Sequence, residues 1–265
     1  MKWLPTVFSI VAAVFSFSRV ALALDPVALS IDRACVVVLD PGHGGEDTGA
    51  VGPAGVNEKD VALGVALKTA ELIKTRTLCD VTLTRVDDTF VPLAGRIAIA
   101  NAKGADLFIS IHVNAALRRE ASGVETFFLS VDATDAEAQS LADFENSAAT
   151  VKNASAAAPE GDLKAILLDL VITGAHHESA RLAEAVQTSL LAKTGSPDRG
   201  VKQAPFIVLN NASMPAALVE IGFISNKAEE KRLKQTDEQS RIAQSLYNGI
   251  EVFLKTSTQL AKGAK

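Results

Sequence analysis

Short β-branched runs alternate with longer helical patterns over most of this sequence, and that alternation restricts the fold more than any other feature. We expect strands at residues 36–39, 81–84, 107–111, 124–129, 205–209 and 217–221, and helices at 61–75, 93–102, 162–193 and 229–255. Strand, crossover helix and strand in this order are typical of parallel βαβ units. The sequence therefore predicts one α/β domain, with a mostly parallel twisted sheet of about six strands and helices on both faces.

Residues 132–162 interrupt this rhythm. They are rich in Ala, Ser, Asp and Glu, with a weak helical pattern over 136–151 and a turn at Pro159-Glu160-Gly161. We interpret them as a helical insertion in a domain that spans residues 35–258, because no repeat or Pro/Ser-rich linker divides it. A short lead at 24–34 precedes this domain, and a polar tail at 259–265 follows it.

The first 23 residues have the pattern of a secretory signal peptide. Lys2 precedes an apolar run over residues 3–17, and the small-residue pattern Ala21-Leu22-Ala23 follows. An uncleaved membrane anchor is the alternative, but a bilayer needs roughly 20 apolar residues, and this run is shorter and contains Pro5. We expect cleavage after Ala23, export, and no membrane span in the mature chain.

The charge of the chain argues against a nucleic-acid partner. There are 26 Lys and Arg residues against 31 Asp and Glu, a net charge of -5, and cleavage removes Lys2 and Arg19 to leave 24 against 31, or -7. No cluster of basic residues offers a track for phosphates. We therefore expect no nucleic acid among the ligands.

Two cysteines, Cys35 and Cys79, each lead into a predicted strand. In an exported protein they could form a disulfide if the two strands are neighbours. Two buried free thiols are an equally good interpretation, because sequence does not give the separation of the Cα atoms.

Polar side chains gather where the predicted strands end. His43 lies in the glycine-rich turn after the first strand, His112 follows the third, and Glu220 lies at the end of the last, while Glu58 precedes the first helix. Ligand sites in open α/β sheets lie at the carboxyl ends of strands. Two histidines and one carboxylate can hold a catalytic zinc ion, with a second carboxylate as general base.

Each of these residues also has a structural interpretation. A single histidine after a strand is more often structural than a ligand, and Glu58 could favour the dipole of the helix that follows it. Glu220 could be a buried carboxylate paired with Arg96 or another basic residue. His176 and His177 point in different directions on one helix, which disfavours a shared metal. The coincidence of several such residues at one edge favours the metal site.

Five ordered segments carry a family resemblance: VVLDPGHGGEDTGAVG, NEKDVAL, LAGRIAIANAKGADLFISIHVNA, SGVETFFLS and VEIGFISN. Together they resemble the zinc-dependent N-acetylmuramoyl-L-alanine amidases of the amidase 3 family, over about residues 36–253. The resemblance implies that His43, Glu58 and His112 bind Zn²⁺ and that Glu220 is catalytic. It also implies the substrate, the amide between N-acetylmuramic acid and L-alanine in peptidoglycan or muropeptides.

The insertion resembles a regulatory helix of the cell-division members of that family. Such a helix plugs the zinc site until an activator protein removes it, and the segment Asp143-Phe144-Glu145-Asn146-Ser147-Ala148 is similar to the one that supplies the extra ligand. We expect Glu145 to block the metal in a resting state and an activator of the divisome type to be a partner. A solvated amphipathic helix is the alternative.

Two other functions remain open from the sequence. One is a zinc peptidase or deacetylase that acts on another bond of the wall, and the other is a catalytically silent wall-binding or activator protein. The signal peptide and the division-type insertion favour the periplasm, with the extracellular wall as the alternative.

Overall fold

A computed structural model describes Met1 and residues 31–147 and 162–263 of the chain. These residues form one α/β unit around a six-stranded sheet with the strand order β2-β1-β3-β6-β4-β5. The predicted signal peptide, the lead before residue 31 and the turn at Pro159-Glu160-Gly161 lie outside the described residues. Within the described part, no helix is both long enough and apolar enough to cross a bilayer.

The sheet is mostly parallel, as the sequence predicts. Its strands are β1 (Ile31–Pro41), β2 (Thr77–Leu83), β3 (Leu107–Asn114), β4 (Val124–Leu129), β5 (Asp198–Ala204) and β6 (Ala216–Phe223). β1 pairs in parallel with β2 and β3, and β3 with β6, whereas β4 runs antiparallel to β6 and parallel to β5. The carboxyl ends of β1, β3 and β6 therefore lie at one edge.

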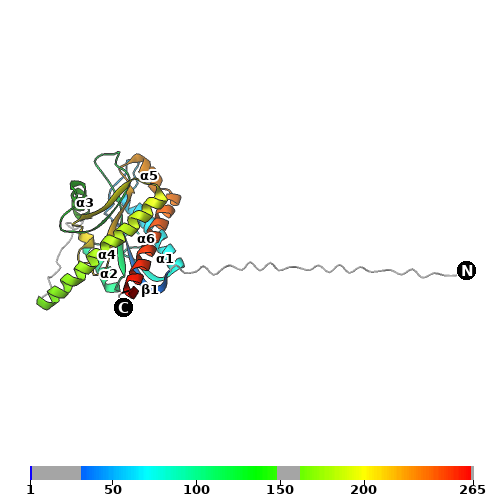
Figure 1. Cartoon of the computed structure of the whole chain (residues 1–265). Coiled ribbons are helices and arrows are strands. Elements are labelled where there is room, and N and C mark those ends of the chain that lie inside the picture. Colours follow the sequence, from blue (N-terminus) through cyan, green and yellow to red (C-terminus); the bar gives the residue numbers. More distant parts are fainter. Residues whose placement is uncertain (2–30, 148–161, 264–265) are drawn as a thin grey trace.

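Helices cover both faces of the sheet (Figure 1). The long helices α1 (Glu58–Arg76), α4 (Asp162–Thr194) and α6 (Thr236–Gly263) pack on one face. The shorter helices α2 (Leu93–Lys103) and α3 (Ala136–Asn146) and the 3-10 turn η2 (Ile207–Leu209) pack on the other. Helix α5 (Lys227–Leu233) follows β6 near the carboxyl edge.

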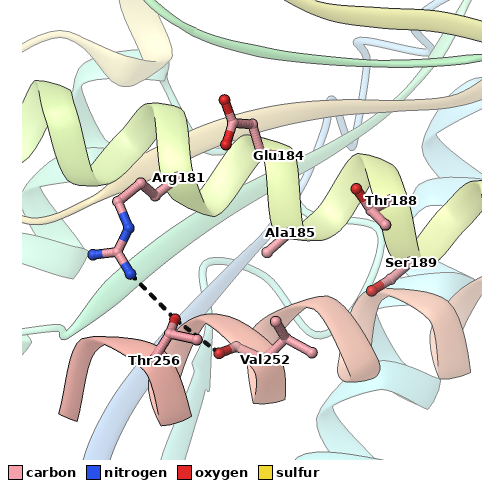
Figure 2. Close-up of a pocket in the computed structure, with 7 residues that line it drawn as sticks. All are labelled: Arg181, Glu184, Ala185, Thr188, Ser189, Val252 and Thr256. Atoms are coloured by element: carbon pink, nitrogen blue, oxygen red, sulfur yellow. Dashed lines mark hydrogen bonds between the residues drawn. The ribbon is translucent and has the colours of Figure 1, made fainter. Parts of the chain in front are cut away.

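Helices α4 and α6 lie side by side along the first face. Figure 2 shows the groove between them, of about 280 Å³, where Arg181 of α4 donates a hydrogen bond to Thr256 Oγ1 of α6 at 3.2 Å. Their shared contact covers the sheet opposite the face on which α3 packs.

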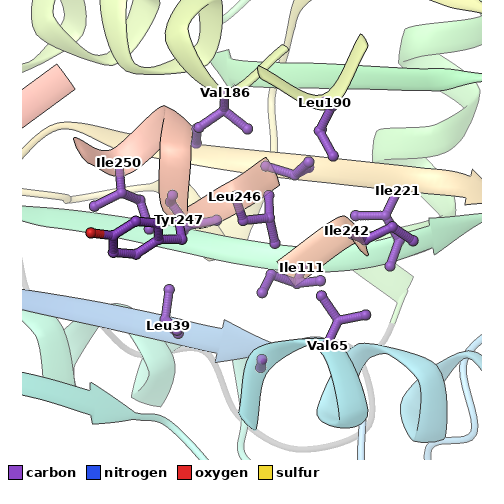
Figure 3. Close-up of a cluster of buried hydrophobic side chains, with 14 of the residues drawn as sticks. Leu39, Val65, Ile111, Val186, Leu190, Ile221, Ile242, Leu246, Tyr247 and Ile250 are labelled. Atoms are coloured by element: carbon purple, nitrogen blue, oxygen red, sulfur yellow. The ribbon is translucent and has the colours of Figure 1, made fainter. Parts of the chain in front are cut away.

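The alternation of side chains along each strand divides the core into two clusters. Val37 and Leu39 of β1 face α1 and α6, whereas Val38 between them faces α2, and all three are fully buried. Figure 3 shows the first cluster, in which side chains of α1, α4 and α6 meet those of β1, β3 and β6. Strands buried on both faces account for the continuous apolar runs in the sequence.

Two predicted elements are wrong. Residues 205–209 form no strand: the fifth strand is Asp198–Ala204, and Ile207–Leu209 is a 3-10 turn. Phe206 and Leu209 are apolar because they fill the second core cluster, not because they belong to the sheet. β5 escapes detection because it is an edge strand with half-buried polar side chains. The predicted helix at 229–255 is two helices, α5 and α6.

Cys35 and Cys79 form a disulfide between β1 and β2. They are directly paired in the parallel register, with their Cα atoms 4.3 Å apart, and both are buried. The strands that the two residues lead into are neighbours, so the structure decides between the two interpretations that the sequence left open.

The disulfide closes a loop with a sequence separation of 44 residues. Loop-closure entropy then contributes about 4 kcal/mol at most, and native disulfides typically contribute about 2–4 kcal/mol. We expect the double variant Cys35→Ala/Cys79→Ala to lose roughly this much free energy of unfolding in urea titrations. Reduced wild-type protein, the control, should lose a similar amount. Two thiols that alkylate after denaturation without reductant would contradict the disulfide.

Candidate metal centre

Four side chains from four separate segments converge at the carboxyl edge of the sheet. They are His43 after β1, Glu58 at the start of α1, His112 in β3 and Glu145 in the last turn of α3, and one ligand atom of each lies within 4.8 Å of all the others. All four residues are buried. The structure therefore brings together the three predicted ligands and the predicted blocking residue.

The carboxylate oxygens and imidazole nitrogens of the cluster lie close together. Glu58 Oε1 lies 3.2 Å from His43 Nε2 and 3.1 Å from His112 Nδ1. Glu145 Oε2 lies 3.3 Å from His43 Nε2 and 3.1 Å from His112 Nδ1. Each carboxylate thus stands between the two imidazoles.

Helix α3 delivers Glu145 to this cluster through its own C-terminal anchor. The Asn146 side chain donates to Pro205 O at 2.8 Å and accepts from Ile207 N at 2.8 Å. These bonds tie the end of α3 to the segment that leads into η2, so the 205–209 segment supports the site although it is not a strand.

Glycines let the cluster close. A Cβ atom on Gly42 would lie 2.6 Å from the His112 ring, and one on Gly49 would lie 2.6 Å from both Glu58 and His43. Real Cβ atoms do not approach that closely, so any side chain at these positions would push the ligands apart. The glycine-rich turn is a packing requirement of the site.

His43 is held in a strained and oriented position. Its φ of 58° is in the left-handed region, which non-glycine residues seldom adopt without a functional reason. Its Nδ1 lies 3.0 Å from Asp47 Oδ2, and Asp47 Oδ1 accepts from Gly49 N at 3.0 Å. A carboxylate on one ring nitrogen turns the other, Nε2, toward the cluster, as carboxylate partners of metal-binding histidines do.

Two buried arginines hold the backbone of the His43 turn. Arg96 donates to Pro41 O and His43 O at 2.8 Å each, and Arg85 donates to Gly42 O at 2.7 Å. Arg96 also pairs with Asp40 at 2.9 Å, so it is not the partner of Glu220. These bonds satisfy three consecutive carbonyl groups that the turn would otherwise bury without partners.

Glu58 is fixed by backbone donors as well as by the histidines. Ala50 N donates to its Oε2 at 2.9 Å and Val113 N to its Oε1 at 2.8 Å. Burial alone would raise the pKa of this carboxyl, but the charge of His43 and bonds to His112 hold it well below its usual value. Glu58 is therefore ionised, with a role beyond favouring the helix dipole.

The histidines respond to the two carboxylates between them. Burial works against a charged imidazole, yet the charge and hydrogen bonds of Glu145 and the bond to Glu58 raise the pKa of His112 to about 10. Burial also opposes a charged His43, but the charge of Glu58 and the hydrogen bond to Asp47 help to raise its pKa well above the ordinary value. The cluster thus attracts a positive charge, whether that charge is carried by protons or by a metal ion.

Glu220 lies directly beside the cluster. It is fully buried and pairs with His112 across β3 and β6, and neither carboxyl oxygen has a hydrogen-bond partner among the described residues. Burial raises its pKa well above the ordinary value; the charge of His112 works against this rise, and the charges of Glu58, Glu145 and Glu125 add to it. A buried carboxyl without partners is a costly arrangement, typical of a proton-transferring group.

The donor set fits a divalent metal ion. Two imidazole nitrogens and two carboxylate oxygens are ligands that zinc accepts in tetrahedral geometry. His43 Nε2 is buried and meets neither nearby carboxylate with hydrogen-bond geometry, so it lacks a partner among the described residues. An ion at the centre of the cluster would supply that partner.

The residues that support the cluster are not evident from the sequence motifs. Asp47 could have been found, because a carboxylate four residues after a turn histidine is a common orienting partner. Arg85 and the pair Glu229 and Glu230 give no such signal. Glu229 accepts from Phe223 N at 2.7 Å and Glu230 from Ala54 N at 2.8 Å, so these two side chains of α5 anchor the loops on either side of the site.

Comparison with known proteins gives the family. The sequence profile of the amidase 3 family, described as N-acetylmuramoyl-L-alanine amidase, matches residues 37–252. The chain belongs to this family. It is 38% identical over 234 residues to the N-acetylmuramoyl-L-alanine amidase AmiC of Escherichia coli, covering 87% of this chain and 55% of that protein. It is 39% identical to AmiA of Salmonella typhimurium over 216 residues, covering 81% of this chain and 74% of that protein.

Solved structures of amidases share the fold. The catalytic domain of CwlV from Bacillus (Paenibacillus) polymyxa is 31% identical, with a TM-score of 0.62 over 83% of this chain and 98% of that one. AmiC2 of Nostoc punctiforme is 28% identical, with a TM-score of 0.63 over 86% of this chain and 99% of that one. The predicted fold class and family are therefore confirmed. The chain spans about half the length of the AmiC relative.

The close approach at Gly42 generates a test of the metal site. We expect Gly42→Ala to weaken divalent-metal affinity by about ten-fold or more, because the new methyl group displaces the His112 ring. Competition with a chromophoric chelator measures this. Gly95→Ala is the matched control, since a Cβ atom there would meet Val91 Cγ1 at an ordinary 3.6 Å. Equal affinities for the two variants would argue against a metal at this cluster.

Proposed function

We propose that this chain is a zinc-dependent amidase that cleaves the bond between N-acetylmuramic acid and L-alanine in peptidoglycan. His43, Glu58 and His112 would hold the ion, and Glu220 would carry the proton. The observation that carries the proposal is the buried ligand cluster with an unpartnered carboxyl beside it, on the strand next to His112. Membership of the amidase family supports the choice of substrate.

The metal ion, Glu220 and the residues around the His43 turn have separate roles in the proposed reaction. Zinc held by the ligand cluster would supply a Lewis acid for the scissile carbonyl and would lower the pKa of the attacking water. Glu220 accepts the proton of the attacking water and returns it to the departing amine of L-alanine. Asp47, Arg85 and Arg96 keep the His43 turn in place, so the ligands need not reorganise during the reaction.

Glu145 makes the described arrangement a resting state. Catalytic zinc sites keep one position open for water or substrate, whereas His43, Glu58, His112 and Glu145 together fill four positions. We propose that α3 blocks the centre and that an activator protein displaces it. A solved relative 26% identical to this chain is the CwlD amidase of Clostridioides difficile in complex with the GerS lipoprotein, which supports the existence of a protein partner.

The proposal includes a cellular role. We place the reaction in wall remodelling and separation of daughter cells, with an activator of the divisome type. The N-terminal pattern of residues 1–23 supports export and a periplasmic site of action.

Product analysis tests the proposed reaction. After incubation of the purified chain and zinc with muropeptides of defined structure, mass spectrometry should detect free stem peptide that begins with L-alanine. We expect Glu220→Gln to lower the rate by about a hundredfold or more, because proton transfer typically contributes that much, and a chelator should abolish the reaction. Cleavage at a different bond would identify a wall peptidase or deacetylase in its place.

Removal of the blocking ligand tests the resting state. We expect Glu145→Ala to raise basal hydrolysis by about ten-fold or more, because the open fraction of the protein grows. Asp143→Ala is the matched control, since Asp143 is exposed on the same helix and contacts Gln139 rather than the cluster. Equal basal rates for both variants would remove the autoinhibitory role of Glu145.

A further inference from the structure

A cavity of about 690 Å³ opens beside the metal cluster, under helix α3. It is lined by residues that continue the site-bearing strands and helix, namely Asn114 after His112, Phe223 after Glu220 and Phe144 before Glu145. Ala116 and Leu117 give it apolar walls, and Leu117 is fully exposed. A cavity of this size accommodates several residues of a peptide.

Arg199 of β5 presents a preorganised guanidinium to this cavity. Its guanidinium carbon lies 4.8 Å from the centre of the Phe223 ring, and its Nε lies 3.3 Å from Glu125 Oε2. Glu125 is buried and is held in turn by Asn114 at 2.7 Å and Lys202 at 3.1 Å. Stacking and pairing fix the plane of the guanidinium, so little entropy is lost when its outer edge binds a carboxylate.

The outer edge of Arg199 already holds a carboxylate, which comes from α3. Glu137 Oε2 lies 2.7 Å from Arg199 Nη2, and Glu137 Oε1 lies 3.6 Å from Arg118 Nη2. Lys202 makes a parallel contact with Asp135 at 3.1 Å. Without Glu137 and the N-cap residue Asp135, Arg199 and Lys202 would share the single carboxylate of Glu125, and Arg118 would lose its acidic partner.

The spacing along α3 relates this contact to the metal cluster. Glu137 and Glu145 are eight residues apart, about 12 Å along the helix axis. An extended peptide covers that distance in three to four residues. A peptide whose scissile amide lies at the cluster could therefore bring a carboxylate of about its third residue to Arg199.

We propose that Arg199, assisted by Arg118, binds a free carboxylate of the stem peptide about three residues beyond the scissile amide. While α3 is docked, Glu137 occupies the carboxylate-binding edge of Arg199, and Glu145 occupies a ligand position of the metal cluster. The inference rests on the proposed amidase function for its substrate. The ligand of the 690 Å³ cavity would then be an acidic peptide in extended form.

Matched substrates test the carboxylate subsite. We expect the Glu145→Ala form to show a KM about ten-fold higher for a muropeptide whose third-residue carboxylate is amidated than for its free-acid twin, with a similar kcat. Arg199→Gln should bring this KM ratio close to one, and Arg199→Lys should give an intermediate ratio. Glu137→Gln should lower KM for the free acid, because the competing carboxylate is gone.

Two controls keep the result interpretable. Ser140→Ala changes an uncharged residue of the same helix and cavity and should leave the KM ratio intact. Arg118→Gln changes an exposed side chain and should lower the KM ratio partly. This variant still tests the proposal if circular dichroism shows that Arg199→Gln is unfolded. Equal KM values for the two substrates, or an Arg199→Gln ratio like that of the parent, would overturn the proposal.

Calorimetric titration of the Glu145→Ala form with a free-acid tripeptide and with its amide tests the carboxylate subsite independently of the proposed reaction. If no muropeptide is hydrolysed but the acid tripeptide binds more tightly than its amide in an Arg199-dependent manner, the reaction is wrong and the subsite stands. If hydrolysis occurs and neither tripeptide is preferred, the reaction stands and the subsite is wrong.

Discussion

The metal cluster depends on one buried cation. Arg96 is 1% exposed and pairs with Asp40, which also accepts from Thr84 and Ser110. Burial opposes ionisation of Asp40, but the charge of Arg96 and these hydroxyl donors keep its pKa below the usual value. Arg96 also donates to the carbonyls of Val91, Pro41 and His43. Removal of either Arg96 or Asp40 would leave the other as an unpaired buried charge under the turn. The hydrogen bonds of this network hold the turn firmly enough to keep His43 at its strained φ.

The sequence predicts the parts of the fold whose side chains repeat with a clear period. β1, β3 and β6 are buried on both faces, so their apolar runs identify them, and the site residues could be located at their ends. β5 could not be found, because its polar residues are specified by ion pairs with α3 and β4 rather than by burial. Phe206 and Leu209 gave a false strand prediction for the opposite reason. They are apolar residues that fill the second core cluster, and they take no part in strand pairing.

The candidate site shows the same division. His43, Glu58, His112 and Glu220 could be singled out from the sequence because the proposed zinc chemistry uses those residue types at strand ends. Arg85 is not, because its role is to satisfy backbone carbonyls of Pro41, Gly42 and Lys59 that only the folded turn brings together. Contacts between distant segments have no local pattern, so the supporting residues emerge only from the structure.

Helix α3 couples regulation to recognition in the proposed arrangement. Its two ends hold Glu137 at Arg199 and Glu145 at the histidines, so one rigid element covers both places that a peptide substrate would use. A substrate with a carboxylate for Arg199 then competes with Glu137 and favours the state in which Glu145 has left the metal. Linkage requires the reverse as well: an activator that binds the displaced helix raises the affinity for acidic peptides by the same factor. Selectivity and activation would thus draw on a single conformational equilibrium, whose docked state is stabilised by ion pairs at one end of α3 and metal ligation at the other.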